Sequence, residues 1–223
     1  MSISNPAPSA TKYLSVDGNV ANLIRERGYV ISGGHFDIGG GFHSESWVYK
    51  DPMLADPQVL KELCRPMAFK LRSMEFEHEM ERIDAFAGRA NGGLVIASQL
   101  SVHARTRTEC YFAEETHLGL KFRPSFSEAL KGKRVVVAGV VITTGRTIRE
   151  VADEVRRQGG EVVGAVAWFR RTLTGPGDLG NVPFVLTLNR DCLQTWAEQT
   201  CPLCEQGTPL SNEHGIHLPD RFC

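Results

Sequence analysis

Apolar residues recur with two different spacings along this chain, and the spacing changes after Arg82. Before that point it is helical, and Pro57 to Met80 predicts a long amphipathic helix with apolar positions at Leu60, Leu63, Met67 and Leu71. A second helical pattern runs from Asp17 to Gly28. Between these two helices, the glycine-rich segment Gly33 to Gly41 predicts a loop or a broken strand.

After Arg82, short apolar runs alternate with helical stretches, which is typical of an α/β fold with a mainly parallel sheet. We expect strands at Ala85 to Ala87 and Cys110 to Ala113 and a helix at Gly92 to Val102. The clearest unit begins with a β-branched run at Arg134 to Ile142, followed by a polar turn at Thr143 to Thr147. A helix at Ile148 to Gln158 and a further buried run at Val162 to Trp168 complete it. We therefore expect a parallel sheet of about five strands flanked by helices, with the ligand site at the loops that follow the strands.

Length and composition favour one domain. The 223 residues are 42% hydrophobic and carry a formal net charge of -1, which allows a large core and argues against nucleic acid as a partner. We expect a flexible tail over residues 1–13 and a single domain over residues 14–223. No apolar run reaches about 18 residues and the first residues lack a signal-peptide pattern, so we expect a cytoplasmic protein with no membrane partner. The six cysteines are too scattered for a disulfide scaffold and should be reduced thiols.

The polar turn Thr143-Thr144-Gly145-Arg146-Thr147 joins the buried strand to the next predicted helix. At such a junction, backbone N–H groups, hydroxyls and the positive end of the helix point to one place, which suits a dianionic phosphate. The alternative is an ordinary strand-to-helix turn whose threonines cap the helix. The residues alone leave both interpretations open.

With its preceding strand, this turn resembles the signature of type I phosphoribosyltransferases, in which it holds the 5-phosphate of phosphoribosyl diphosphate. Further segments are similar to the orotate branch of that family, in the same order along the chain. They are the opening segment Gly34-His35-Phe36 with Gly40-Gly41-Phe42-His43-Ser44, the diphosphate loop Gly88-Arg89-Ala90-Asn91-Gly92-Gly93, and a C-terminal Cys201-Pro202-Leu203-Cys204 tail found in one bacterial group.

The resemblance implies a type I phosphoribosyltransferase fold with a small hood, formed by residues from about 29 to 51 and parts of the C-terminal tail. It also implies Mg²⁺ as cofactor, phosphoribosyl diphosphate or a nucleotide as ligand, and a homodimer. The implied base site consists of Gly40, Gly41, His43, Ser44, Lys50 and Arg170. A mobile loop that closes over the site would carry His117, Lys121 and Arg123.

Several positions depart from the family pattern. Gly139 and Val140 stand where the family has two acidic residues that hold the ribose hydroxyls, and Glu115 stands where it has a cation aimed at the diphosphate. Gly40 replaces a serine of the base site, and Phe169 replaces an Asp before Arg170. The phosphate loop itself is intact. These departures favour selection for something other than the standard reaction.

The remaining candidate residues have structural alternatives. Cys201 and Cys204, together with His214 and His217, have the residue types of a zinc site, but the gap between the pairs is short and a packed tail is the favoured interpretation. Trp168 and Phe169 suit core packing better than an apolar wall against a ligand ring. The single histidines at His78 and His103 suit surface or core positions.

Three functions are compatible with this sequence. The first is transfer of phosphoribosyl to orotate or a related acidic heterocycle. The second is altered chemistry on a nucleotide 5′-monophosphate, because the diphosphate contacts could decay while the phosphate loop stayed. The third is a nucleotide sensor without catalysis.

Overall fold

The computed structural model describes residues 11–16, 19–80, 82–104, 108–173, 176–189 and 191–211. Its main sheet has seven strands in the order β1-β9-β8-β7-β4-β5-β6. All neighbouring pairs are parallel except β5 and β6, which confirms the mainly parallel sheet. The strands are β1 (Lys12–Ser15), β4 (Ala85–Arg89), β5 (Glu109–Thr116), β6 (Gly119–Phe122), β7 (Arg134–Ile142), β8 (Glu161–Arg170) and β9 (Phe184–Thr187).

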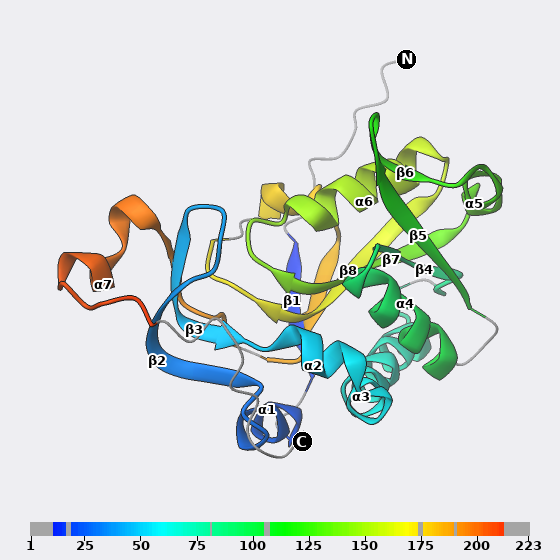
Figure 1. Cartoon of the computed structure of the whole chain (residues 1–223). Coiled ribbons are helices and arrows are strands. Elements are labelled where there is room, and N and C mark those ends of the chain that lie inside the picture. The colour runs from blue at the N-terminus through cyan, green and yellow to red at the C-terminus, as the bar shows by residue number, and fades with distance from the viewer. Residues whose placement is uncertain are drawn as a thin grey trace.

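Helices cover both faces of this sheet. In Figure 1, α3 and α4 lie below the sheet and α6 lies above it. Side chains alternate along β7, so that Val136 and Ala138 join the core under α3 and α4, whereas Val135 and Val137 join the core under α6. The helices are α1 (Asn19–Glu26), α2 (Lys50–Ala55), α3 (Pro57–Phe76), α4 (Gly92–His103), α5 (Pro124–Leu130), α6 (Arg146–Arg157) and α7 (Pro202–Glu205). None of the helices within the described ranges is long and apolar enough to cross a lipid bilayer.

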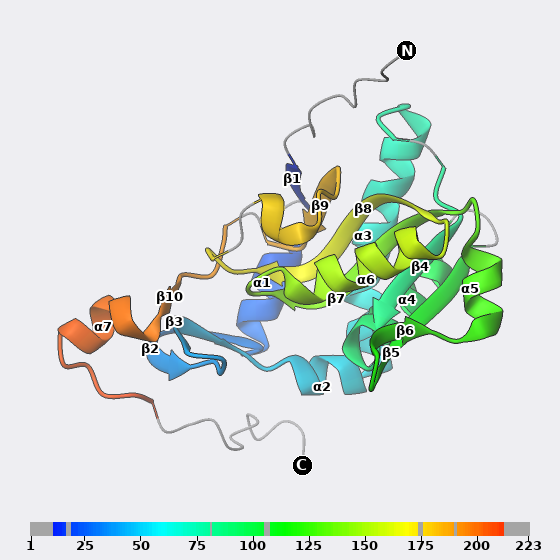
Figure 2. The same ribbon diagram turned by 90° about the horizontal axis from the view of Figure 1, so that it is seen from above.

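A second, three-stranded sheet lies beside one end of the main sheet in both views (Figures 1 and 2). Its strand order is β10-β3-β2, with β2 (Val30–Asp37), β3 (Phe42–Val48) and β10 (Thr195–Ala197). The glycine-rich segment lies partly in β2, where the pairing with β3 shifts register between Ser32 and Phe36, so the broken strand is the correct alternative. We call these three strands with η2 (Glu198–Thr200) and α7 the hood.

Several short strands were missed in the sequence. β1 lies partly within the expected tail because Lys12 to Ser15 pair in parallel with β9, while residues 1–10 fall outside the described part of the chain. β6, β9 and β10 have three or four residues each. Runs of that length are too short to show a period, so the sheet is wider than the five strands expected.

Asp84 and Arg134 tie together the starts of β4 and β7. Oδ2 of Asp84 accepts hydrogen bonds from the backbone N–H and from Nε of Arg134, both at 3.0 Å. The hydrogen bond from the Arg134 side chain is the main cause that lowers the pKa of the Asp84 carboxyl, and the backbone bond adds to it. A carboxyl whose pKa is lowered by folding adds stability above its unfolded pKa of about 3.9, and loses that contribution as the pH falls through the folded pKa.

We expect Asp84→Asn to lower the free energy of unfolding at pH 7 by about 1 kcal/mol, because the pair is only partly buried. The difference from the wild type should shrink below a pH of about 4, where the wild-type carboxyl also becomes neutral. Urea unfolding over a pH series measures both. Asp153→Asn, which removes an exposed ion pair with Arg156, is the control and should cost much less. An equal cost of Asp84→Asn at pH 7 and pH 3 would contradict this account.

Candidate functional site

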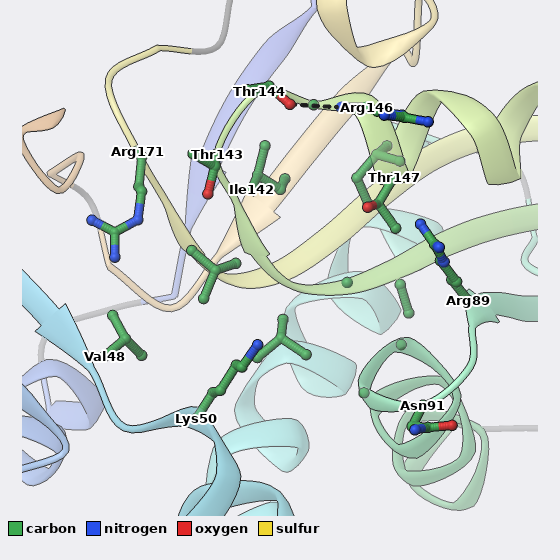
Figure 3. Close-up of a pocket in the computed structure, with 18 of the residues that line it drawn as sticks. Val48, Lys50, Arg89, Asn91, Ile142, Thr143, Thr144, Arg146, Thr147 and Arg171 are labelled. Atoms are coloured by element: carbon green, nitrogen blue, oxygen red, sulfur yellow. Dashed lines mark hydrogen bonds between the residues drawn. The ribbon is translucent and has the colours of Figure 1, made fainter. Parts of the chain in front are cut away.

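A cavity of about 590 Å³ opens at the carboxyl ends of β4, β7 and β8. Three loops and the edge of the hood form its walls, as Figure 3 shows. It therefore lies where the sequence predicts the ligand site. The polar and glycine positions that line it include Lys50, Asp51, Arg89, Asn91, Gly92, Gly93, Gly139, Thr143, Thr144, Gly145, Arg146, Thr147 and Arg171.

The loop after β7 lines this cavity over its whole length, from Thr143 to Thr147. Gly145 precedes α6 with a left-handed backbone, at a φ of 79°. Because the first N–H groups of a helix have no acceptor within the helix, α6 presents the backbone donors of Thr147 and Ile148 where these residues meet the cavity, whereas the N–H of Arg146 donates to Thr144 Oγ1 at 3.5 Å (Figure 3). The Arg146 side chain points along the helix in Figure 3. Its Nε donates to Glu150 at 2.6 Å. The backbone amides of Thr147 and Ile148 and the Thr147 hydroxyl, rather than the Arg146 side chain, are thus available to an anion.

The loop after β4 forms the opposite wall of the cavity. Arg89 to Gly93 line it, whereas Gly88 does not. Instead, Gly88 lets α4 approach the sheet closely, because a Cβ there would lie 2.3 Å from the backbone carbon of Gly93. Arg89 donates to Glu115 at 2.6 Å and lies 3.7 Å from Glu150. Its guanidinium charge is therefore already compensated within the protein.

Arg171, rather than the expected Arg170, reaches the cavity. Successive residues at the end of β8 face opposite ways, and the Arg170 guanidinium instead lies 3.9 Å from the centre of the Tyr13 ring. Arg171 is only 4% exposed, and burial lowers its pKa to about 10, so it is still protonated at neutral pH. Within the described ranges it has no carboxylate partner, and Figure 3 shows it on the hood side of the cavity.

Hydrogen bonds from the hood hold Arg171 in place. Its Nη1 donates to Ser44 Oγ at 2.7 Å, and to Ser46 O and Thr195 Oγ1 at 3.3 Å. Ser44, one of the expected base-site residues, is fully buried and also donates to the Gln194 carbonyl at 2.5 Å. Ser44 therefore positions Arg171 and does not line the cavity.

The other expected base-site residues are split between two places. Lys50 lines the cavity at the start of α2, and its side chain points into it (Figure 3). Gly40 and Gly41 lie in the exposed turn between β2 and β3 and do not line it. His43 is buried in the hood, where it meets His35 and Cys204.

The expected mobile loop is a tight hairpin between β5 and β6. The Thr116 hydroxyl donates to the Gly119 carbonyl at 2.7 Å across a turn that contains His117. Lys121 pairs with Glu154 at 3.2 Å, and Arg123 pairs with Glu114 at 2.9 Å. Within the described chain, His117, Lys121 and Arg123 do not line the cavity.

Gly139 and Val140 line the middle of the cavity, where the family has its acidic pair. Val140 closes against the loop after β4, since a Cβ on Gly92 would lie 2.5 Å from Val140 Cγ2. Asp51 is the only acidic residue among those that line the cavity, whereas Lys50, Arg89, Arg146 and Arg171 are cationic. Lys50 and Arg171 have no ion-pair partner in the described ranges, so the cavity favours an anion.

Other candidate residues lie away from the cavity. Trp168 and Phe169 are buried in the same core cluster, which agrees with core packing. His78 and His103 follow or end helices at a distance from the cavity lining. His214 and His217 lie outside the described residues.

Comparison with solved structures shows what fold this is. Orotate phosphoribosyltransferase from Aeropyrum pernix matches with a TM-score of 0.53 at 24% identity, over 76% of this chain and 93% of that one. Adenine phosphoribosyltransferase from Trypanosoma brucei, solved with AMP, pyrophosphate and ribose-5-phosphate, matches with a TM-score of 0.58 at 17% identity, over 91% and 93%. At these identities the likeness establishes the fold of type I phosphoribosyltransferases.

Sequence relatives place the chain more closely. The orotate phosphoribosyltransferase of Carboxydothermus hydrogenoformans is 33% identical over 79% of this chain and 87% of the relative. That of Caldanaerobacter subterraneus is 34% identical over 84% and 92%. No family model matches the sequence. The chain therefore belongs to the type I phosphoribosyltransferase family, among the relatives of orotate phosphoribosyltransferase.

Alanine substitutions at two glycines with a positive φ test whether the loop after β7 binds phosphate. Gly145 and Gly132 both have positive φ, at 79° and 69°. An added Cβ at Gly145 would lie 2.7 Å from the Asp178 carbonyl oxygen, whereas at Gly132 it would meet nothing within 4 Å. Gly132→Ala should therefore cost only the left-handed backbone penalty of about 1 kcal/mol.

We expect Gly145→Ala to cost more than Gly132→Ala and to displace the loop. Calorimetric titration with inorganic phosphate should show affinity reduced by roughly tenfold or more in Gly145→Ala and unchanged in Gly132→Ala. Urea unfolding of both variants gives the stability difference. Unchanged phosphate affinity in a folded Gly145→Ala protein would remove this loop from the anion site.

Proposed function

We propose that this chain binds a phosphoribosyl ligand by its 5-phosphate and transfers the phosphoribosyl group from phosphoribosyl diphosphate to orotate or a related acidic heterocycle. The observation that carries the proposal is the shared cavity, which unites the loop after β7, the loop after β4, and Lys50 and Arg171, two cations with no ion-pair partner among the described residues. The names of the sequence relatives support the choice of orotate.

Each wall of the cavity has a part in this proposal. The N–H groups of α6 and the hydroxyls of Thr143 to Thr147 would hold the 5-phosphate. The backbone of Arg89 to Gly93 would face the diphosphate that leaves, and Arg171 would hold the carboxylate of the acceptor in a planar, two-point contact. Since the reaction passes through a positively charged ribosyl centre, catalysis would come from positioning and from stabilising the leaving diphosphate.

Within the described residues, the cavity lining offers a single carboxylate, Asp51, to a protein-bound Mg²⁺. Gly139 and Val140, at the positions of the family's acidic pair, have no side-chain oxygen. We therefore assign no step to a metal held by these residues. A homodimer, a cytoplasmic location and a place in pyrimidine biosynthesis remain predictions that rest on the family resemblance.

Gly139 and Val140 also favour a second candidate function. Without carboxylates at these positions, Asp51 is the one described lining residue with a negative charge to set against the charge that develops on the sugar ring. Glu115 moreover forms an ion pair with Arg89, on the side of the cavity where the diphosphate would lie. A protein that binds a nucleoside 5′-monophosphate, as a sensor or with altered chemistry, needs the phosphate loop and Arg171 but not these groups.

Binding measurements with two neighbouring arginines test the proposed site. Calorimetry with phosphoribosyl diphosphate, orotate and several nucleoside 5′-monophosphates, with and without Mg²⁺, should detect binding to the wild type. Arg171→Gln should weaken orotate or nucleotide binding by on the order of tenfold to a hundredfold, because a buried charge-assisted pair is lost. Arg170→Gln, at a position outside the cavity, is the control and should bind as the wild type does. If no ligand binds the wild type, the proposed function is wrong.

Restoring the acidic pair separates transfer from binding alone. A Cβ at Gly139 would lie 3.1 Å from Ile148 Cδ1, the end of a flexible side chain, so Gly139→Glu can be accommodated. We expect Gly139→Glu with Val140→Asp to strengthen phosphoribosyl diphosphate binding in Mg²⁺ and to raise the rate of transfer to orotate. Gly139→Gln with Val140→Asn has the same shape without the charge and is the matched control. If the acidic variant folds but exceeds the neutral one in neither measurement, the binding function takes the place of transfer.

A further inference from the structure

Four side chains that can bind a metal meet inside the hood, at a place separate from the cavity. They are His35 of β2, His43 of β3, and Cys201 and Cys204 at the start of α7. One nitrogen or sulfur atom of each lies within 4.8 Å of all the others. His35, His43 and Cys201 are 2%, 5% and 1% exposed, and Cys204 closes the cluster at the surface. We call this group the hood cluster.

Three of four distances between ligand atoms of the hood cluster agree with a single zinc ion, and the fourth, between the two histidine nitrogens, is about 0.3 Å shorter. Zn–S bonds of about 2.3 Å and Zn–N bonds of about 2.0–2.1 Å in a tetrahedron place the ligand atoms about 3.3–3.8 Å apart. His35 Nε2 lies 3.5 Å from Cys201 Sγ and 3.6 Å from Cys204 Sγ. His43 Nδ1 lies 3.3 Å from Cys204 Sγ and 3.0 Å from His35 Nε2. A cluster with two irons would need its ligands divided between two metal atoms, whereas these four surround one point.

Hydrogen bonds alone satisfy this arrangement poorly. His35 Nδ1 lies 2.7 Å from the Thr208 carbonyl and must donate to it, because a carbonyl only accepts. His35 Nε2 therefore presents one lone pair, and His43 and both thiols converge on it. One lone pair accepts one strong hydrogen bond, whereas a cation uses a lone pair from each of the four atoms. A histidine that binds zinc with one nitrogen and donates to a carbonyl with the other is the usual arrangement.

Charge and local structure agree with a zinc ion. Two thiolates and two neutral imidazoles around Zn²⁺ sum to zero, which suits a largely buried site. The two cysteines have the spacing Cys-x-x-Cys of structural zinc sites, and the histidines reach the same point from adjacent antiparallel strands. The segment that carries the cysteines has only η2 and α7, of three and four residues, which are too short to be stable alone.

We propose that the hood cluster is a structural zinc site formed by His35, His43, Cys201 and Cys204. All four coordination positions come from the protein, so the metal fastens the C-terminal segment to β2 and β3 and leaves no position open for a substrate. The site differs from the zinc set considered in the sequence, because the histidines come from the hood hairpin. It is independent of the proposed function, since none of the four residues lines the cavity.

The metal content of the purified protein tests this site directly. Protein made without chelators should contain about one zinc ion per chain by mass spectrometry of the metal. Cys201→Ser with Cys204→Ser should reduce zinc at least roughly tenfold and lower the melting temperature. Cys192→Ser, which changes a half-buried cysteine outside the cluster, should keep both unchanged.

Measurements on the wild type keep the test decisive if the double variant does not fold. Removing zinc with a chelator should lower the melting temperature, and Co²⁺ in its place should give the visible absorption of tetrahedral thiolate coordination. The proposal is overturned if the wild type contains no zinc and gives no such spectrum with added Co²⁺. A disulfide between Cys201 and Cys204 in protein purified without oxygen would also overturn it, as would zinc retained in the folded double variant.

Discussion

Parallel pairing of β4, β7 and β8 brings the loops after β4 and β7 and Arg171 to one edge of the sheet. Gly88 pairs with Ala138, and Ile142 pairs with Arg170, so three strands end at the same edge of the sheet. The loop after β4, the loop after β7 and Arg171 consequently face one cavity. Because β7 is buried on both faces, its register can hardly shift, and the geometry of the cavity follows from the packing of the core.

Charge is distributed unevenly around this cavity. On the side of β4, Arg89 is held by Glu115 and Glu150, and Glu150 also accepts from Arg146. On the side of the hood, Lys50 and Arg171 face the cavity with no acidic partner in the described ranges. An incoming anion would therefore find free cations beside the hood, whereas at the loop after β4 it would have to displace Glu115. This distribution favours a ligand with a phosphate and an acidic ring over one recognised mainly by its diphosphate.

The sequence predicted the large elements because their patterns are local. Arg134 to Ile142 is long, β-branched and bounded by a polar turn, and it forms β7 with the expected ends. Which of Arg170 and Arg171 faces the cavity depends instead on where β8 ends. Neighbouring residues of a strand point to opposite faces, so an error of one residue exchanges the two arginines, and no local pattern fixes that position. The hood cluster could not be predicted from the sequence for another reason. His35 and Cys201 are 166 positions apart, and only the antiparallel hairpin of the hood brings the second histidine beside them.

The hood has to be held firmly because it carries a buried positive charge. A guanidinium that is 4% exposed and has no carboxylate partner in the described ranges depends on its hydrogen bonds. Arg171 donates these to Ser44, Ser46 and Thr195 of the hood. Ser44 follows His43 directly in β3, so the ligand atoms of the hood cluster and the support of Arg171 share one strand. Movement of β3 would take two of the three acceptors, Ser44 and Ser46, away from Arg171. Zinc binding free energy in the hood cluster would oppose that movement, which explains why a metal at a distance from the cavity can be useful to a protein that recognises an anion there.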